Sequence, residues 1–183
     1  MAAAPEGFLQ AGPSAWTFVL FTVLVLGAVS DLRRAKIPNW LTYSAMVGGL
    51  LLHTAQSGIS GLSQSAGGLV LGIALLLAFY LLGGMGAGDV KFMGAVGSWL
   101  GLSGVLSAVF VTALLGGFYA VVVAVRHWGV GPGVQRILSL FIAWALTGRL
   151  RQALAPLETQ PRLRYGVVIA LGTVVSQWWT GRL

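Results

Sequence analysis

The chain has 183 residues, of which 57% are hydrophobic and only 8% are charged, and its mean hydropathy is +0.87. So little polar surface cannot cover a soluble globule, and the composition predicts an all-α integral membrane protein. The net charge of +7 does not indicate nucleic acid, because no basic run is interleaved with aromatic residues. The absence of cysteine excludes disulfides, cysteine-ligated zinc and a thiol nucleophile.

Apolar segments follow one another along the chain and predict six transmembrane helices. A full span needs roughly 20 residues, so the short fourth segment is expected to be tilted, re-entrant or partly buried by its neighbours. No positively charged region precedes the first segment, which is therefore predicted to be a retained span and not a cleaved signal peptide. The predicted helices cover residues 16–30, 40–54, 65–82, 90–100, 105–125 and 165–179.

The connections between these helices carry local signals. Pro38 breaks the chain after the first helix, and Asn39 can cap the second helix. Residues 55–64 are expected to form a polar turn. In the third helix, Gly68 and Gly72 form a pair of small residues on one face, which would let another helix approach closely.

The positive charges predict the orientation, because cytoplasmic loops of membrane proteins carry an excess of Lys and Arg. If both termini face outside, only Arg182 lies on the outer side. Asp31 and Asp89 then lie on the same, cytoplasmic, side of the bilayer. The predicted cytoplasmic residues are Arg33, Arg34, Lys36, Lys91, Arg126, Arg136, Arg149, Arg151, Arg162 and Arg164. The tryptophans that fall near predicted span ends, where an amphipathic ring prefers to sit, are Trp16, Trp40, Trp99, Trp178 and Trp179.

One further apolar segment, residues 137–146, is bracketed by arginines and is too short for a span of roughly 20 residues. We expect it to be an interfacial helix on the cytoplasmic face. It lies within a predicted cytoplasmic loop of residues 127–164. The whole chain, 1–183, is then a single membrane-embedded domain with a short N-terminal tail, residues 1–15.

The candidate chemistry lies in two of the four acidic residues, Asp31 and Asp89, each of which follows an apolar run abruptly. An ionised carboxylate at membrane depth is costly, so each is a functional-site candidate. Two carboxylates held close together cannot both ionise cheaply, and such a pair shares a proton. One can then take a proton from water while the other donates to a substrate carbonyl oxygen, and the pattern does not assign which is the base.

The turn before the second aspartate is rich in glycine. Gly84, Gly86 and Gly88 would let the backbone bend sharply and let an extended substrate lie close to it. Lys91 does not share a helical face with Asp89 and is expected to reach the lipid headgroups.

Both aspartates also have a structural interpretation. Asp31 could form an interfacial ion pair with the basic residues that follow it, and Asp89 could be the N-cap of the fourth helix. The catalytic interpretation is favoured because both residues fall on one face of the membrane in a chain with few acids.

Residues 31–39 read Asp-Leu-Arg-Arg-Ala-Lys-Ile-Pro-Asn, and residues 86–91 read Gly-Ala-Gly-Asp-Val-Lys. These segments resemble the two catalytic motifs of bacterial type IV prepilin peptidases, the second of which is shared in part with presenilin and signal peptide peptidase. Gly-x-Gly-Asp alone would be a weak signal, and Ile-Pro-Asn upstream makes it a strong one. The last helix also resembles the family's final span, with Arg164 where a proline is expected.

The resemblance implies an inner-membrane aspartic endopeptidase that removes the basic leader of prepilins or pseudopilins on the cytoplasmic side. Its partners would be that substrate and the lipid bilayer, with no nucleic acid, no metal and no other cofactor. Longer family members carry an N-terminal domain with paired cysteines, associated with N-methylation, so this chain resembles the short members of tight-adherence (Flp-type) pilus systems. The implied site residues are Asp31 and Asp89 as the catalytic pair, with Pro38, Asn39, Gly86, Gly88 and Lys91 in substrate-binding loops.

Two other classes of function remain open at this point. The chain could be a small ion-coupled transporter in which the two aspartates bind a cation, although no convincing internal repeat supports this. It could also be a non-catalytic membrane scaffold of a pilus or secretion machine, in which the aspartates are structural. Replacement of each aspartate by asparagine distinguishes the three, through loss of proteolysis, of transport or of assembly.

Overall fold

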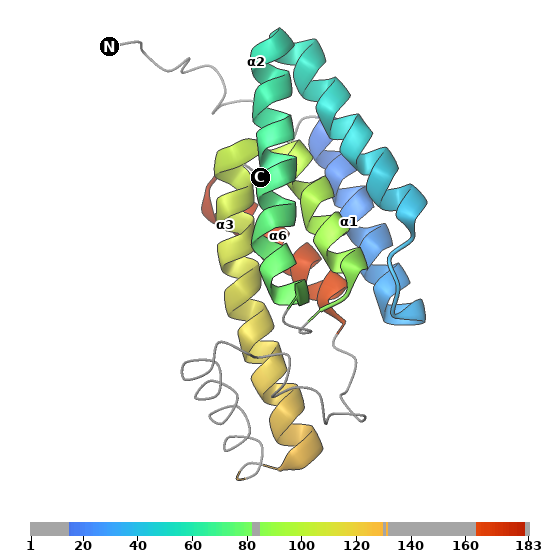
Figure 1. Ribbon diagram of the computed structural model, residues 1–183, viewed down its shortest axis with the longest axis vertical. Helices are drawn as coiled ribbons and strands as arrows, with labels where there is room; N and C mark the ends of the chain where they lie inside the picture. Colours follow the sequence, from blue (N-terminus) through green and yellow to red (C-terminus); the bar gives the residue numbers. More distant parts are fainter. Residues whose placement is uncertain (1–14, 82–84, 130, 132–163, 182–183) are drawn as a thin grey trace, which may run out of the picture.

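The computed structural model describes residues 15–81, 85–129, 131 and 164–181. Within this part of the chain the regular structure is entirely helical, which confirms the predicted all-α class. The helices are α1 (Ala15–Arg34), α2 (Asn39–Leu81), α3 (Ala87–Trp128) and α6 (Tyr165–Trp179), as labelled in Figure 1. Almost all of the predicted N-terminal tail, the predicted interfacial helix at residues 137–146 and most of the predicted loop of residues 127–164 lie outside the described residues.

The two long helices α2 and α3 are each a pair of helices joined by a sharp bend. In α2 the backbone is non-helical at Ser57 and Gly58, and in α3 it is non-helical at Gly101. Both glycines have positive φ angles, of 57° and 67°, which glycine adopts without the steric cost of a side chain. Figure 1 shows each long helix running to one end of the bundle and turning back. The six predicted helices are therefore present as helical segments.

Two predicted boundaries are wrong. The polar turn expected at residues 55–64 is a bend confined to Ser57 and Gly58, after which the helix resumes. The hydroxyls of Ser60 and Ser63 each donate to the carbonyl three residues earlier, so these polar residues continue the helix. At the other boundary, α1 extends through Arg34 and places Asp31 within its last turn.

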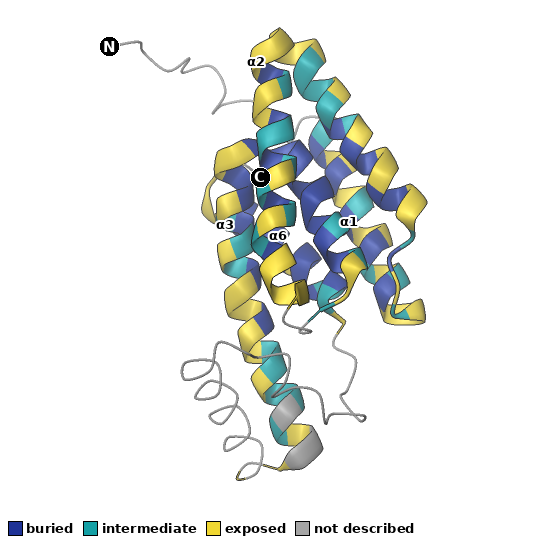
Figure 2. Cartoon of the chain, viewed as in Figure 1, coloured by how far each residue is buried: buried dark blue, intermediate teal, exposed yellow. Residues whose placement is uncertain are grey.

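The outer surface of the bundle is apolar, as a lipid environment requires. By length and composition, three helices could cross a membrane, namely Trp16–Arg34, Asn39–Leu81 and Ala87–Val123. Large apolar side chains such as Phe18, Leu51 and Phe118 are exposed on these helices, and exposed residues cover much of their outward faces in Figure 2. The length of these helices and their exposed apolar side chains identify a membrane protein.

The small-residue pair of the third helical segment makes the predicted close contact. A Cβ added to Gly68 would collide with the carbonyl oxygen of Gly97, and one added to Gly72 would lie 2.7 Å from the carbonyl oxygen of Met93. The facing segment of α3 also has a glycine at this contact, namely Gly97. A Cβ on Gly97 would collide with the backbone of Gly68. The two backbones thus approach as closely as glycine allows.

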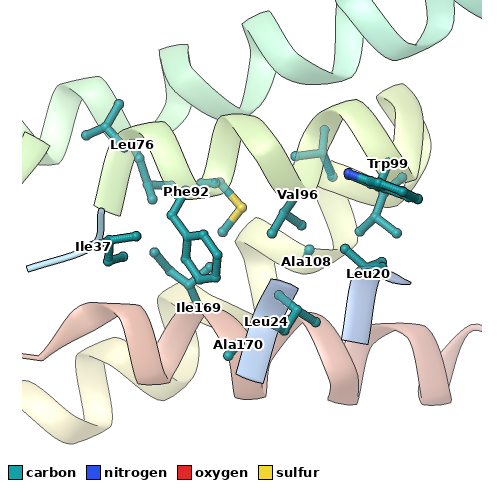
Figure 3. Packing of buried hydrophobic residues seen from close by; sticks show 14 of the residues in the cluster. Leu20, Leu24, Ile37, Leu76, Phe92, Val96, Trp99, Ala108, Ile169 and Ala170 are labelled. Carbon is teal, nitrogen blue, oxygen red and sulfur yellow. The ribbon is translucent and has the colours of Figure 1, made fainter. Parts of the chain in front are cut away.

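The hydrophobic core is formed by the first half of α3 together with residues of α1, α2, the second half of α3 and α6. The ring of Phe92 is fully buried and points among Leu24, Ile37 and Ile169 in Figure 3. The ring also fills the space left by Gly27 of α1, where a Cβ would collide with it. The backbone of α1 comes closest to that of α6, which in turn packs against α3.

Trp99 is not the interfacial residue that its position near a span end suggested. Its side chain is only 6% exposed, and its Nε1 donates to the carbonyl oxygen of Ala45 at 2.8 Å. A buried indole needs such an acceptor. Trp40, Trp178 and Trp179, in contrast, are largely exposed, in keeping with their predicted place at the membrane surface.

Candidate active site

Asp31 is buried where α1 ends, with only 5% of its surface exposed. Its Oδ2 accepts a hydrogen bond of 2.8 Å from the backbone N–H of Gly166, in the first turn of α6. A Cβ at position 166 would lie 2.9 Å from both Cβ and Oδ2 of Asp31, so this close approach requires glycine. The neighbouring Arg33 and Arg34 are exposed, which argues against the interpretation of Asp31 as half of a surface ion pair.

The contact with Gly166 also caps α6. The first N–H groups of a helix have no acceptor within the helix, and the residue before it usually supplies one. Arg164, the N-cap residue of α6, makes no side-chain capping bond. Asp31 accepts from the N–H group of Gly166 instead, and the N–H group of Val167 lies close enough to act on the same carboxylate. A carboxylate from α1 therefore caps a helix distant in the sequence.

Asp89 is held within its own turn. It lies in the first turn of α3 and is 7% exposed. Its Oδ2 accepts from the backbone N–H of Gly86 at 3.0 Å, while its own N–H donates to the carbonyl oxygen of Gly86 at 3.1 Å. Asp89 thus has a capping contact, as the structural interpretation expected, but from the third helical position and not from the N-cap. Within the described residues its Oδ1 accepts no hydrogen bond from the protein.

The structure brings the two aspartates together. The charge of Asp31 acts on Asp89, so the two carboxyl groups lie within electrostatic reach of each other. Tyr165, the first residue of α6, lies close enough to interact with Asp89 in the same way. Its ring packs on α3 beside Gly116, where a Cβ would be 2.9 Å from Cε1 of the tyrosine. The residue pair Tyr165 and Gly166 therefore adjoins both carboxylates.

The two sequence motifs are joined by direct contacts. Lys91 donates from Nζ to Oδ1 of Asn39 at 3.2 Å, and the same ammonium lies 5.2 Å from the ring centroid of Tyr43. The expectation that Lys91 reaches the lipid headgroups is therefore wrong, because its ammonium binds within the protein. Ile37 is buried beside Gly88, where a Cβ would be 3.7 Å from the isoleucine backbone.

The remaining predicted site residues have structural roles in the same region. Pro38 directly precedes α2, and its carbonyl oxygen accepts from Leu41 and Thr42 at 3.2 and 3.3 Å. Asn39, predicted as the cap, is instead the first residue of the helix. Gly86 supplies the N–H that holds Asp89, and Gly84 lies outside the described residues. No group of three or more metal-binding side chains occurs in the part of the chain that the structure describes.

Sequence reasoning assigned no role to Tyr165 or Gly166, although both belong to the helix whose resemblance to the family was noted. The signal that could have found Gly166 is a glycine in the first turn of a helix, where glycine is not needed for the helix itself. That signal is weak by itself, and the role of Gly166 is evident only from its contact with Asp31.

An apolar groove lies beside Tyr165. It has a volume of about 130 Å³ and lies between the second half of α2, the second half of α3 and the start of α6. Its lining includes Leu76, Phe79, Met85, Val109, Gly116 and Tyr165. Tyr165 is also within electrostatic reach of Asp89, whereas neither aspartate lines the groove.

We expect the contact of Lys91 with Asn39 to stabilise the joined motifs. Lys91→Met removes the hydrogen bond and the cation–π contact, and should reduce the free energy of unfolding in detergent by about 1 kcal/mol. Lys36→Met, at an exposed position, is the control and should change it little. If the double variant with Asn39→Ala is destabilised by the sum of the single effects, the two side chains are not coupled and the prediction is wrong.

The structure is thus a bundle of apolar helices with two buried aspartates from different helices. Comparison with known proteins gives the family. Residues 18–121 match the type IV leader peptidase family, and the chain belongs to that family. The resemblance to type IV prepilin peptidases drawn from the two motifs is thereby confirmed.

The curated relatives are consistent with this assignment. The chain is 31% identical over 135 residues to a prepilin leader peptidase/N-methyltransferase of Neisseria gonorrhoeae, which covers 65% of this chain and 47% of the relative. It is 35% identical over 103 residues to the protein of that name from Dickeya chrysanthemi, covering 52% and 36%. For the one from Bacillus subtilis the values are 26% over 155 residues, 83% and 53%. The chain thus spans about half or less of the length of these relatives, and no solved structure matches it.

Proposed function

We propose that this protein is an aspartic endopeptidase that cleaves the N-terminal leader of prepilins or pseudopilins. The observation that carries the proposal is that Asp31 and Asp89, from helices α1 and α3, are both buried and within electrostatic reach of each other. Burying a carboxylate in a membrane protein costs free energy, so such residues are rare and mark functional sites. Membership of the type IV leader peptidase family supports the same activity.

In the proposed mechanism the two carboxyl groups share one proton and act as a pair. The ionised carboxylate takes a proton from a water molecule, which attacks the scissile carbonyl carbon. The protonated carboxyl donates to the carbonyl oxygen, and a tetrahedral diol forms without a covalent intermediate. When the diol collapses, the C–N bond breaks and the proton taken from water passes to the leaving amine.

The backbone orients this pair. One oxygen of each carboxylate accepts a backbone N–H, from Gly166 in the case of Asp31 and from Gly86 in the case of Asp89. Such bonds fix the side-chain rotamers, which a reaction between aligned atoms requires.

The proposed substrate suits the surroundings of the pair. A prepilin presents a basic leader followed by an apolar helix, so its scissile bond lies at the membrane surface. The apolar groove beside Tyr165 offers that helix a surface of the same character. The distribution of positive charge in the sequence places the pair at the cytoplasmic face of the inner membrane in this proposal.

The test is cleavage of a leader-bearing prepilin by the purified protein in proteoliposomes, with the new N-terminus read by mass spectrometry. We expect loss of the leader in these vesicles and an intact precursor in vesicles without the protein. An intact precursor in both would refute the proposal and favour the transporter or scaffold interpretation. The side of the membrane is tested with membranes from cells. Inverted inner-membrane vesicles, which expose the cytoplasmic face, should process added precursor, whereas intact spheroplasts should not.

A further inference from the structure

The two carboxylates of the proposed pair are held in place by different means. Asp89 is bonded to Gly86, within its own turn. Asp31 is bonded to Gly166, which is 135 residues away in the sequence and belongs to another helix. The backbone of α1 lies closer to α6 than to α2 and α3, and α1 meets α3 through the side chain of Phe92 at Gly27. The position of Asp31 relative to Asp89 therefore depends in part on how α6 is placed.

The start of α6 is built for this contact. The helix has no capping side chain of its own, because Arg164 cannot accept a hydrogen bond. Its free N–H groups are instead directed at Asp31. On the other side, Tyr165 packs against α3 beside Gly116 and close to Asp89. One turn of α6 thus contacts the helices that carry both aspartates.

We propose that Gly166, with the first turn of α6, is a positioning element for the peptidase reaction and sets the distance and orientation of Asp31 relative to Asp89. The inference rests on the proposed function. Glycine is required at position 166 for two reasons. Its N–H is the donor to Asp31, and any Cβ there would lie 2.9 Å from Oδ2 and Cβ of the aspartate.

The direct test is Gly166→Ala. The added Cβ must push Asp31 away from the first turn of α6, and a displacement of about 1 Å in a catalytic geometry costs roughly 100-fold in rate. We therefore expect kcat for leader cleavage to fall by about 100-fold while KM stays within about twofold, because the substituted residue acts on the pair and not on substrate binding.

A second variant removes a donor without adding bulk beside Asp31. Val167→Pro deletes the N–H of Val167, which lies close enough to Asp31 to act on its carboxylate. Proline is tolerated in the first helical turn because that N–H has no acceptor within the helix, and glycine at position 166 lacks the Cβ that would clash with the ring. We expect kcat to fall by about 10-fold with KM unchanged, since the bond from Gly166 remains. If Gly166→Ala does not accumulate in membranes, the kcat of Val167→Pro alone tests whether the first turn of α6 positions Asp31.

Two glycine substitutions control for packing. Gly172→Ala lies on the same helix and is crowded by Thr112 of α3, so it tests disturbed helix packing away from the pair. It should lower the melting temperature but leave kcat of the folded fraction within about twofold. Gly117→Ala faces open space and should leave the melting temperature unchanged, and it is a control for stability alone because Gly117 lines the apolar groove.

The outcomes separate the inference from the proposed function. If the wild type does not cleave, the proposed function fails and this inference fails with it. If the wild type cleaves and both Gly166→Ala and Val167→Pro retain its kcat, only the positioning role is wrong. The same conclusion follows if Gly172→Ala lowers kcat as much as Gly166→Ala, because the effect would then be general packing of α6.

Discussion

Replacing either aspartate by asparagine should reduce leader cleavage by about 1,000-fold or more. Asparagine is nearly the same size as aspartate, but it can neither take the proton from water nor donate one to the carbonyl oxygen. Asp31→Asn keeps an oxygen that can accept from Gly166, and Asp89→Asn keeps one that can accept from Gly86, so both variants should fold. The measurement is the initial rate of cleavage in proteoliposomes at matched amounts of folded protein.

The controls separate chemistry from structure. Glu6→Gln and Glu158→Gln, at the remaining acidic positions, should leave the rate unchanged. Asp31→Ala removes the acceptor for α6 as well as the carboxyl group, and should be less stable than Asp31→Asn by about 1 kcal/mol, as is usual when a helix cap is lost. A wild-type rate in either asparagine variant would rule out the catalytic pair.

Gly97→Val should destabilise the protein by about 3 kcal/mol or more. A Cβ at this position would collide with the carbonyl oxygen of Gly68, and it would lie 3.1 Å from Cγ2 of Val105. Because the obstacle on one side is backbone, rotamer changes cannot relieve the clash, and the two helices must separate. The measurement is the free energy of unfolding in detergent.

The matched control is Gly117→Val, on α3 at a position with open space around it. Valine has a somewhat higher helix propensity than glycine, so this variant should change the free energy of unfolding by less than about 1 kcal/mol and should not destabilise the protein. Equal destabilisation by the two valine variants would mean that the contact between α2 and α3 does not depend on glycine.

The helices of this fold were largely predictable from the sequence, and the contacts between them were not. Long apolar runs indicate helices whatever their neighbours are, and the last one, Tyr165–Trp179, has the predicted boundaries. The turn at residues 55–64 was mispredicted because serine can remain in a helix by bonding to its own backbone, so polarity alone did not mark an end. Gly68 and Gly72 indicated a close contact, but their partner Gly97 depends on how the helices align.

The same distinction applies to the candidate site. Asp31 and Asp89 stood out because acidic residues are rare in this chain and each interrupts an apolar run. Gly166 and the partner of Lys91 were missed because their roles arise from contacts between distant segments. Trp99 was misplaced because burial depends on which face of its helix meets α2, and a tryptophan near a span end does not reveal that.

The bond between Asp31 and Gly166 has a consequence for biosynthesis. Chains are made from the N-terminus, and these two residues are 135 positions apart, so α1 and α3 are synthesised before α6 exists. A nascent chain therefore holds both aspartates before the helix that fixes the first of them has been translated. In the proposed enzyme, the carboxylate of Asp31 therefore reaches its bonded position only after α6 has been inserted.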